Sequence, residues 1–215
     1  SISGAGDIDL ASGVALSAGA DNSSTTFDGV ISGAGSFTKQ GTGTLIFSGA
    51  APNAYTGATT VEAGTLNLSA GSGLADVSAL SVSSGATFDL DVSDVIGSIS
   101  GTGDIDLASG VTLSAGADNS STTFDGVISG DGGLSKLGVG SLTFTGANTY
   151  TGSTDVVNGN LIVSGSLSDQ TGLNISADGI YSVAADDQVG SISGSGQVQL
   201  GAQTLTAGNS ANAEF

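Results

Sequence analysis

The feature that most constrains this chain is a long internal repeat. Residues 1–33 match residues 98–130 at every position except Ala5/Thr102 and Ala15/Thr112, and a third copy begins at Ser191. A fixed long period indicates an architecture built by stacking equivalent units. We therefore expect one continuous solenoid over residues 1–215, with block 1 at 1–97, block 2 at 98–190 and a partial block 3 at 191–215. Because the sequence opens inside the repeat, we interpret it as a segment of a longer protein.

A shorter period lies inside each block. Segments such as TLIFSG at Thr44, TLNLSA at Thr65 and SLTFTG at Ser141 alternate apolar and polar residues and are bounded by Gly, Ser or Asn. This pattern is typical of short, half-buried strands, and spacings of roughly 19 to 30 residues suit the coils of a solenoid. Regular two-residue hairpin turns, which a β-sandwich would need, do not separate the segments.

The predicted fold is therefore all-β: a right-handed, single-stranded parallel β-helix (β-solenoid). We expect about nine coils that stack at roughly 4.8 Å into a rod about 45 Å long. Both ends would be uncapped, with open sheet edges.

Composition excludes many kinds of chemistry. The chain has no His and no Cys, and its formal net charge is −18. It therefore lacks the residues of Ser-His or Cys-His nucleophiles and of zinc sites. Its charge would repel nucleic acid and anionic lipid, and no run approaches the roughly 20 apolar residues of a membrane helix. We predict no enzyme activity, no cofactor, no nucleic-acid partner and no membrane insertion by this segment.

The pair Asp7 and Asp9 is the first candidate site. On a strand both carboxylates point to one side, roughly 7 Å apart, and such a pair could flank a glycosidic bond. In the third copy, however, Gln197 and Gln199 stand at these positions, and Gln cannot act as a base or a charged ligand. We therefore interpret the aspartates as solvent-facing and predict no catalytic residue.

Calcium is the second candidate ligand, because Asp side chains are suitable ligands for it. The densest acidic cluster is DLDVSD, with Asp89, Asp91 and Asp94. It is only partly repeated, since Asp94 matches Asp187 whereas Asp91 becomes Ala184. We assign no metal site and keep these three aspartates as weak calcium candidates only.

A lysine and a tyrosine recur once per block. Lys39 and Lys136 are the only basic side chains, and we expect each to neutralise stacked aspartates or to cover apolar surface with its stem. Tyr55 and Tyr150 precede Thr-Gly and should anchor a turn onto the core. Four phenylalanines should stack inside the column: Phe27, Phe47, Phe124 and Phe144.

Two long stretches resemble a known family. ISGAGSFTKQGTGTLIFSGAAPNAYTGATTVEAGTLNLS at 31–69 and ISGDGGLSKLGVGSLTFTGANTYTGSTDVVNGNLIVSG at 128–165 are similar to the autotransporter-associated β-strand repeat. The resemblance implies the passenger of a secreted bacterial surface protein, exported across the outer membrane and displayed as a β-helical stalk.

These observations favour a structural role. We expect a stalk segment of a bacterial cell-surface adhesin or extracellular filament, with a role in adhesion or aggregation. Its expected partners are neighbouring repeats of the same chain, another copy, or a surface glycan or protein. The alternative is a β-helix that binds or hydrolyses carbohydrate with surface carboxylates.

Overall fold

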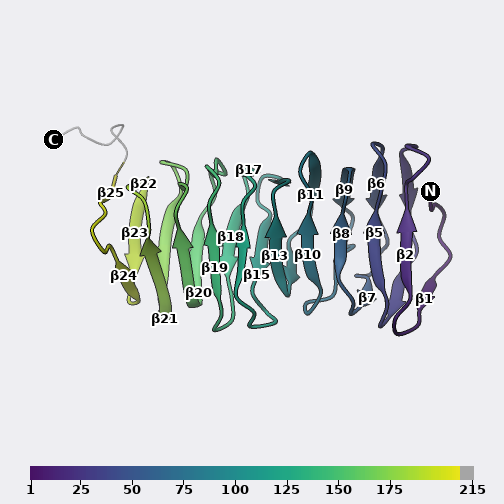
Figure 1. Ribbon diagram of the computed structural model, residues 1–215, viewed down its shortest axis with the longest axis horizontal. Coiled ribbons are helices and arrows are strands. Elements are labelled where there is room, and N and C mark those ends of the chain that lie inside the picture. Colours follow the sequence, from purple (N-terminus) through teal and green to yellow (C-terminus); the bar gives the residue numbers. More distant parts are fainter. Residues whose placement is uncertain (209–215) are drawn as a thin grey trace.

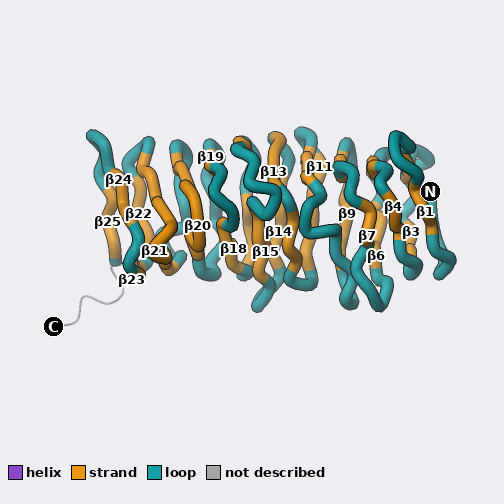
Figure 2. Tube along the Cα trace, turned by 90° about the horizontal axis from the view of Figure 1, so that it is seen from below, coloured by secondary structure: helices purple, strands orange, loops and turns teal. Residues whose placement is uncertain are grey.

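The protein is a rod of stacked coils (Figures 1 and 2). The computed structural model describes residues 1–208; the last residues of the predicted block 3 lie outside it. The chain makes about ten turns, one more than predicted, and strands of successive coils pair in parallel. Residues 1–208 form no helix, and therefore none that is long and apolar enough to cross a membrane. The predicted all-β parallel solenoid is confirmed.

Each turn passes three sides of the rod, which we name faces A, B and C. Face A contains β2 (Ala15–Ala18), β5 (Ser36–Lys39), β8 (Thr59–Val61), β10 (Ala79–Val82), β13 (Ser98–Gly101), β16 (Thr122–Phe124), β19 (Ser141–Phe144), the second halves of β20 (Thr154–Val163) and β21 (Gly172–Val183), and β24 (Gln197–Gln199).

Faces B and C complete each turn. Face B contains β3 (Thr25–Phe27), β6 (Thr44–Phe47), β9 (Gly64–Leu68), β11 (Ala86–Leu90), β14 (Asp104–Leu107), β17 (Ile128–Gly130), β22 (Asp187–Val189) and β25 (Leu205–Ala207). Face C contains β1 (Ile8–Leu10), β4 (Ile31–Gly33), β7 (Ala54–Tyr55), β12 (Asp94–Ile96), β15 (Thr112–Ala115), β18 (Gly133–Lys136), the first halves of β20 and β21, and β23 (Ser191–Gly194).

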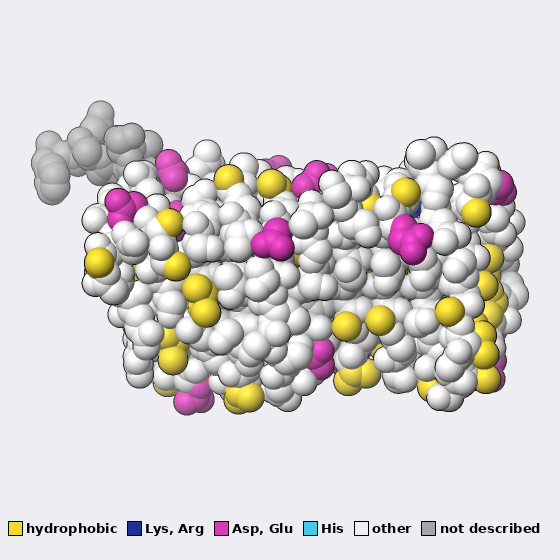
Figure 3. Space-filling view, viewed as in Figure 1, with side chains coloured by type: hydrophobic (Ala, Val, Ile, Leu, Met, Phe, Trp, Pro, Cys, Tyr) yellow, Lys and Arg dark blue, Asp and Glu magenta, His cyan; other side chains and the backbone are white. Residues whose placement is uncertain are grey.

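A single apolar column fills the rod, because alternate residues of every strand point inward. Phe27 and Phe47 stack with ring centroids 6.2 Å apart, and their equivalents Phe124 and Phe144 are 6.4 Å apart. All four rings are buried, which confirms the predicted aromatic stack. The end coils have a neighbour on one side only, so apolar side chains gather visibly at the N-terminal end in Figure 3.

A repeat block does not contain a whole number of turns. From β1 on face C, four turns lead to β12 on face C, and β13 on face A and β14 on face B follow. Because β14 carries the repeat of β1, one block spans about four and two-thirds turns. Equivalent strands therefore lie on different faces. The recurring Ser-Ile-Ser-Gly is beside β3 of face B at residues 1–4, on face A at 98–101 and on face C at 191–194.

Candidate functional site

The recurring polar residues form a corner motif, which we define as Lys39, Asn53 and Tyr55 in block 1 and Lys136, Asn148 and Tyr150 in block 2. All six side chains are at most 2% exposed. A buried polar group is costly unless it forms hydrogen bonds, so their partners reveal what these residues do.

Each lysine closes a corner of the solenoid. Lys39 ends β5, and its Nζ donates hydrogen bonds to the carbonyl oxygens of Gln40 at 2.7 Å, Gly41 at 2.8 Å and Ala63 at 3.0 Å. Ala63 belongs to the next coil, so one ammonium group joins two coils. Lys136 repeats the arrangement with the carbonyl oxygens of Leu137, Gly138 at 2.9 Å and Asn158 at 3.2 Å.

The expectation that these lysines pair with stacked aspartates is wrong, because neither ammonium group directly contacts a carboxylate in the part of the chain that the structure describes. Within residues 1–208 the one ion pair joins the N-terminal amine of Ser1 to Asp21. The ammonium groups bind carbonyl oxygens instead, because the corner turns several of these toward the interior. Burial lowers the pKa of both lysines, that of Lys136 to about 8, where the charge of Asp118 opposes the shift.

The asparagine joins three coils, a role that the sequence analysis missed. Asn53 Oδ1 accepts a hydrogen bond from the N–H of Ile31 at 2.9 Å, and its Nδ2 donates to the carbonyl of Gly73 at 3.1 Å. Asn148 does the same with Ile128 and Ser166, at 2.9 and 3.1 Å. The recurrence of Asn two residues before Tyr in both blocks was the available signal.

The tyrosines anchor the turn, as predicted. Tyr55 shares a hydrogen bond of 2.7 Å with Thr59 Oγ1, and Tyr150 shares one of 2.6 Å with Thr154 Oγ1. Both rings are fully buried, and this burial raises the pKa of each hydroxyl. Neither ring is available to stack on a sugar.

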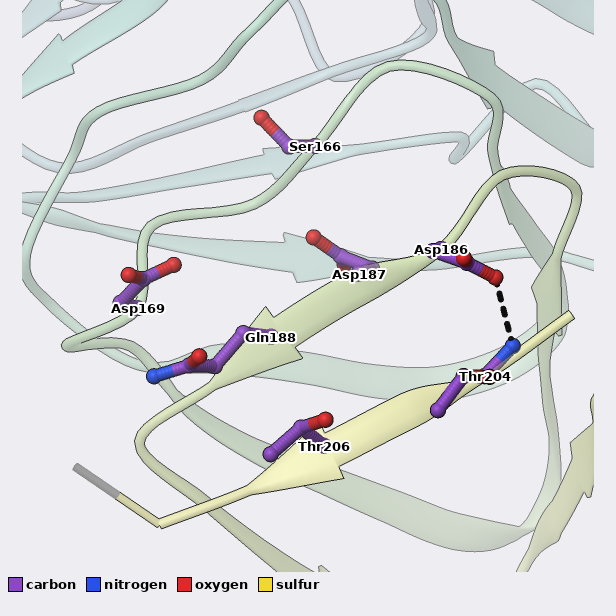
Figure 4. A pocket seen from close by; sticks show the side chains of 7 residues that line it. All are labelled: Ser166, Asp169, Asp186, Asp187, Gln188, Thr204 and Thr206. Atoms are coloured by element: carbon purple, nitrogen blue, oxygen red, sulfur yellow. Dashed lines mark hydrogen bonds between the residues drawn. The ribbon is translucent and has the colours of Figure 1, made fainter. Parts of the chain in front are cut away.

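Two grooves on the rod surface are the same site in successive blocks. The smaller has a volume of about 230 Å³ and the larger about 430 Å³ (Figure 4). Aligned residues line both: Asp76/Asp169, Ser93/Asp186, Asp94/Asp187, Val95/Gln188, Thr112/Thr204 and Ser114/Thr206. The first lies on face C and the second on face B, as the fractional number of turns per block requires.

The inner carboxylate of each groove already has backbone partners. Asp94 Oδ2 accepts the N–H of Leu74 at 2.9 Å, and Asp187 Oδ1 accepts that of Leu167 at 3.2 Å. Asp187 Oδ2 also accepts a hydrogen bond from the hydroxyl of Tyr181 at 2.7 Å. Burial raises the pKa of both carboxyls, that of Asp94 to about 6, and these hydrogen bonds lower it in part. The inner carboxylates thus link neighbouring coils.

The sequence-based candidates lie apart. Asp7 and Asp9 are exposed while Leu10 is buried, as the alternation predicted, and Asp7 Oδ1 accepts the N–H of Val30 at 2.9 Å. Asp89 and Asp91 both accept hydrogen bonds from Nδ2 of Asn67, at 2.8 and 3.0 Å, on face B. Asp94 lies on face C. Among residues 1–208, no three acidic side chains are close enough to hold a metal ion together.

Comparison with known proteins identifies the segment that contains the corner motif. The family model described as the passenger-associated-transport-repeat matches residues 37–68 and 134–163. No curated protein and no solved structure matches the chain.

Proposed function

We propose that this chain, in which two regions match the passenger-associated-transport-repeat of autotransporter passengers, is a stalk segment of a cell-surface adhesin or extracellular filament. The repeat family implies a secreted or cell-surface protein. Export across the outer membrane, and a role in adhesion or aggregation, are the further parts of this proposal.

One observation carries it: the recurring lysine and asparagine side chains bind the backbone of adjacent coils, and the recurring tyrosine binds a threonine side chain four residues further on. Lys39, Asn53 and Tyr55 are buried and hydrogen-bonded within the rod. Such residues serve the stacking of coils, and stacked coils add length in proportion to their number. The repeat family and the solenoid fold fit a structural rather than an enzymatic role.

The carbohydrate-hydrolysing alternative has less support. Its best carboxylates would be Asp94 and Asp187, and both accept hydrogen bonds from backbone N–H groups of a neighbouring coil. A carboxylate held in this way links coils rather than facing a substrate.

The test uses the full-length protein that contains this segment, expressed in its native cells. Antibodies against residues 98–190 should label intact cells, and deletion of that block should leave labelling by antibodies against block 1 while reducing attachment. Labelling that requires permeabilised cells would contradict surface display. Attachment unaffected by rod length would contradict the stalk role.

A further inference from the structure

Face A differs from the other two sides of the rod in charge. Its strand segments, from β2 to β24, contain one acidic residue, Asp178 at the start of the second half of β21, and the seven successive strands from β2 to β19 contain none. Faces B and C carry carboxylates on their outer sides, such as Asp89 and Asp106 on face B and Asp9 and Asp155 on face C. Because both lysines are buried, face A from β2 to β19 is neutral for lack of charge and not through compensation.

A file of hydroxyl groups runs along face A. Strand pairing places one outward-facing Ser or Thr on each of seven successive coils: Ser17, Thr38, Thr60, Ser81, Ser100, Thr123 and Thr143. At roughly 4.8 Å per coil the file is about 29 Å long. Thr60 and Ser81 near the middle of this file are partly exposed, so their hydroxyls can reach a partner.

The neutrality follows the face and not the repeat. Rotation between blocks brings the equivalents of Asp89, Asp104 and Asp106 onto face A, and there the chain has Ser182, Gln197 and Gln199. In the opposite direction, Thr60 of face A corresponds to Asp155 on face C. Asp178 is therefore the one acidic residue in the strands of face A, although the sequences that form this face change from block to block.

We propose that face A is a self-association surface, on which a second copy of this chain packs face to face. Hydroxyl groups both donate and accept hydrogen bonds, so identical files complement each other, as an interface between identical surfaces requires. Files of carboxylates would repel, and each copy carries a formal charge of −18. Face A is thus the side on which two such rods can approach most closely.

The interface is expected to be weak for this segment. Strands about 13 Å long on ten coils offer roughly 600 Å² per copy, at the lower limit of stable interfaces. Longer arrays would add area. The inference rests on the proposed function, because rods displayed in parallel at a surface would meet side by side.

The test is sedimentation equilibrium of the 215-residue chain up to about 1 mM. We expect the mass to rise from 20.3 kDa toward twice that value, with stronger association as added salt screens the charge. The double variant Thr60→Asp/Thr123→Asp should weaken association at least tenfold. The fold should tolerate the first change, because Asp155 occupies the equivalent position. The single variant Thr60→Asp should already weaken association, and its matched control Ser135→Asp, which places the same charge on face C, should leave association unchanged.

Crosslinking gives a second measurement. The chain has no Cys, so Ser81→Cys, at the middle of the file, should form a disulfide dimer on oxidation, whereas Ser135→Cys should not. A chain that stays monomeric, or a double variant that still associates, overturns the inference. A monomer retained through face A by a neutral polysaccharide resin also overturns it and assigns the face to that polymer. If scattering still shows a rod, the proposed stalk function survives this failure.

Discussion

At the scale of single residues, the buried lysine shows how the repeat uses a charge. An ammonium group has three donors and no acceptor, and each buried lysine uses three carbonyl oxygens. The sequence signalled that Lys39 and Lys136 mattered, because they are the only basic residues in the chain. It could not indicate their partners, since every residue has a backbone carbonyl and residue identity does not show which carbonyls a side chain binds.

Replacing the lysine should destabilise the rod. Lys136→Met keeps the stem but leaves the carbonyls of Leu137, Gly138 and Asn158 without their donor. We expect a loss of about 2–4 kcal/mol in the free energy of unfolding, measured by urea denaturation. Glu62→Gln, at an exposed site, is the control and should change stability by less than about 0.5 kcal/mol. Equal stability of both variants would contradict the corner role.

Protonation of Asp94, the inner carboxyl of the smaller groove, should make the protein more stable in mild acid. The folded pKa of Asp94 is raised to about 6 from 3.8, mainly by burial. Between these values the folded state binds more protons than the unfolded state, so the free energy of unfolding rises as the pH falls from about 7 toward 4. The contribution of Asp94 is about 1–2 kcal/mol after solvent screening.

Thermal melting at several pH values tests this expectation. Asp94→Asn keeps an oxygen acceptor for the N–H of Leu74 but cannot ionise, so the variant should gain stability at pH 7 and show a weaker pH dependence. Asp187, whose pKa is also raised, should preserve part of the slope. A variant with the wild-type pH dependence would show that Asp94 titrates normally.

At the scale of strands and turns, glycine columns set how closely the coils approach. A Cβ added to Gly146 would overlap the carbonyl oxygen of Gly126 in the coil below, whereas a Cβ on Gly6 would meet no atom within 4 Å. The strand segments themselves were predictable, because two-residue alternation identified their inward and outward sides. The close contacts between turns were not, since they depend on which coils become neighbours.

Gly146→Ala should therefore separate two coils locally. We expect the melting temperature to fall by several degrees, corresponding to about 1–3 kcal/mol, because the overlap involves backbone that cannot move aside freely. The matched control Gly6→Ala, at an open position with ordinary φ, should melt within about 1 °C of the wild type. Similar melting temperatures of both variants would show that the turns accommodate a methyl group without displacing the neighbouring coil.

At the scale of the whole molecule, the sequence predicted a solenoid but not the placement of its repeats on the three faces. The change from Asp7 and Asp9 to Gln197 and Gln199 argues against a catalytic pair. The structure adds that these pairs lie on faces C and A respectively. Coil lengths vary, as the shifts of 97 and 93 residues show. The face on which a block begins therefore depends on the detailed pairing of its strands.

Because each block begins on a different face, two deletions of equal length should differ in their effect on folding. Removing residues 98–190 joins Gly97, after β12 on face C, to Ser191, whose segment matches the β13 sequence, so the order of faces is kept. The shortened chain should fold and lose about 22 Å in maximum dimension, measured by small-angle X-ray scattering.

Removing residues 85–177 instead joins the end of a face A strand to the start of another, and the path skips faces B and C. This second variant should lose the cooperative melting that the first one keeps. If both fold equally well, the coils tolerate any register, and the placement of Gln197 and Gln199 on face A has no structural cause.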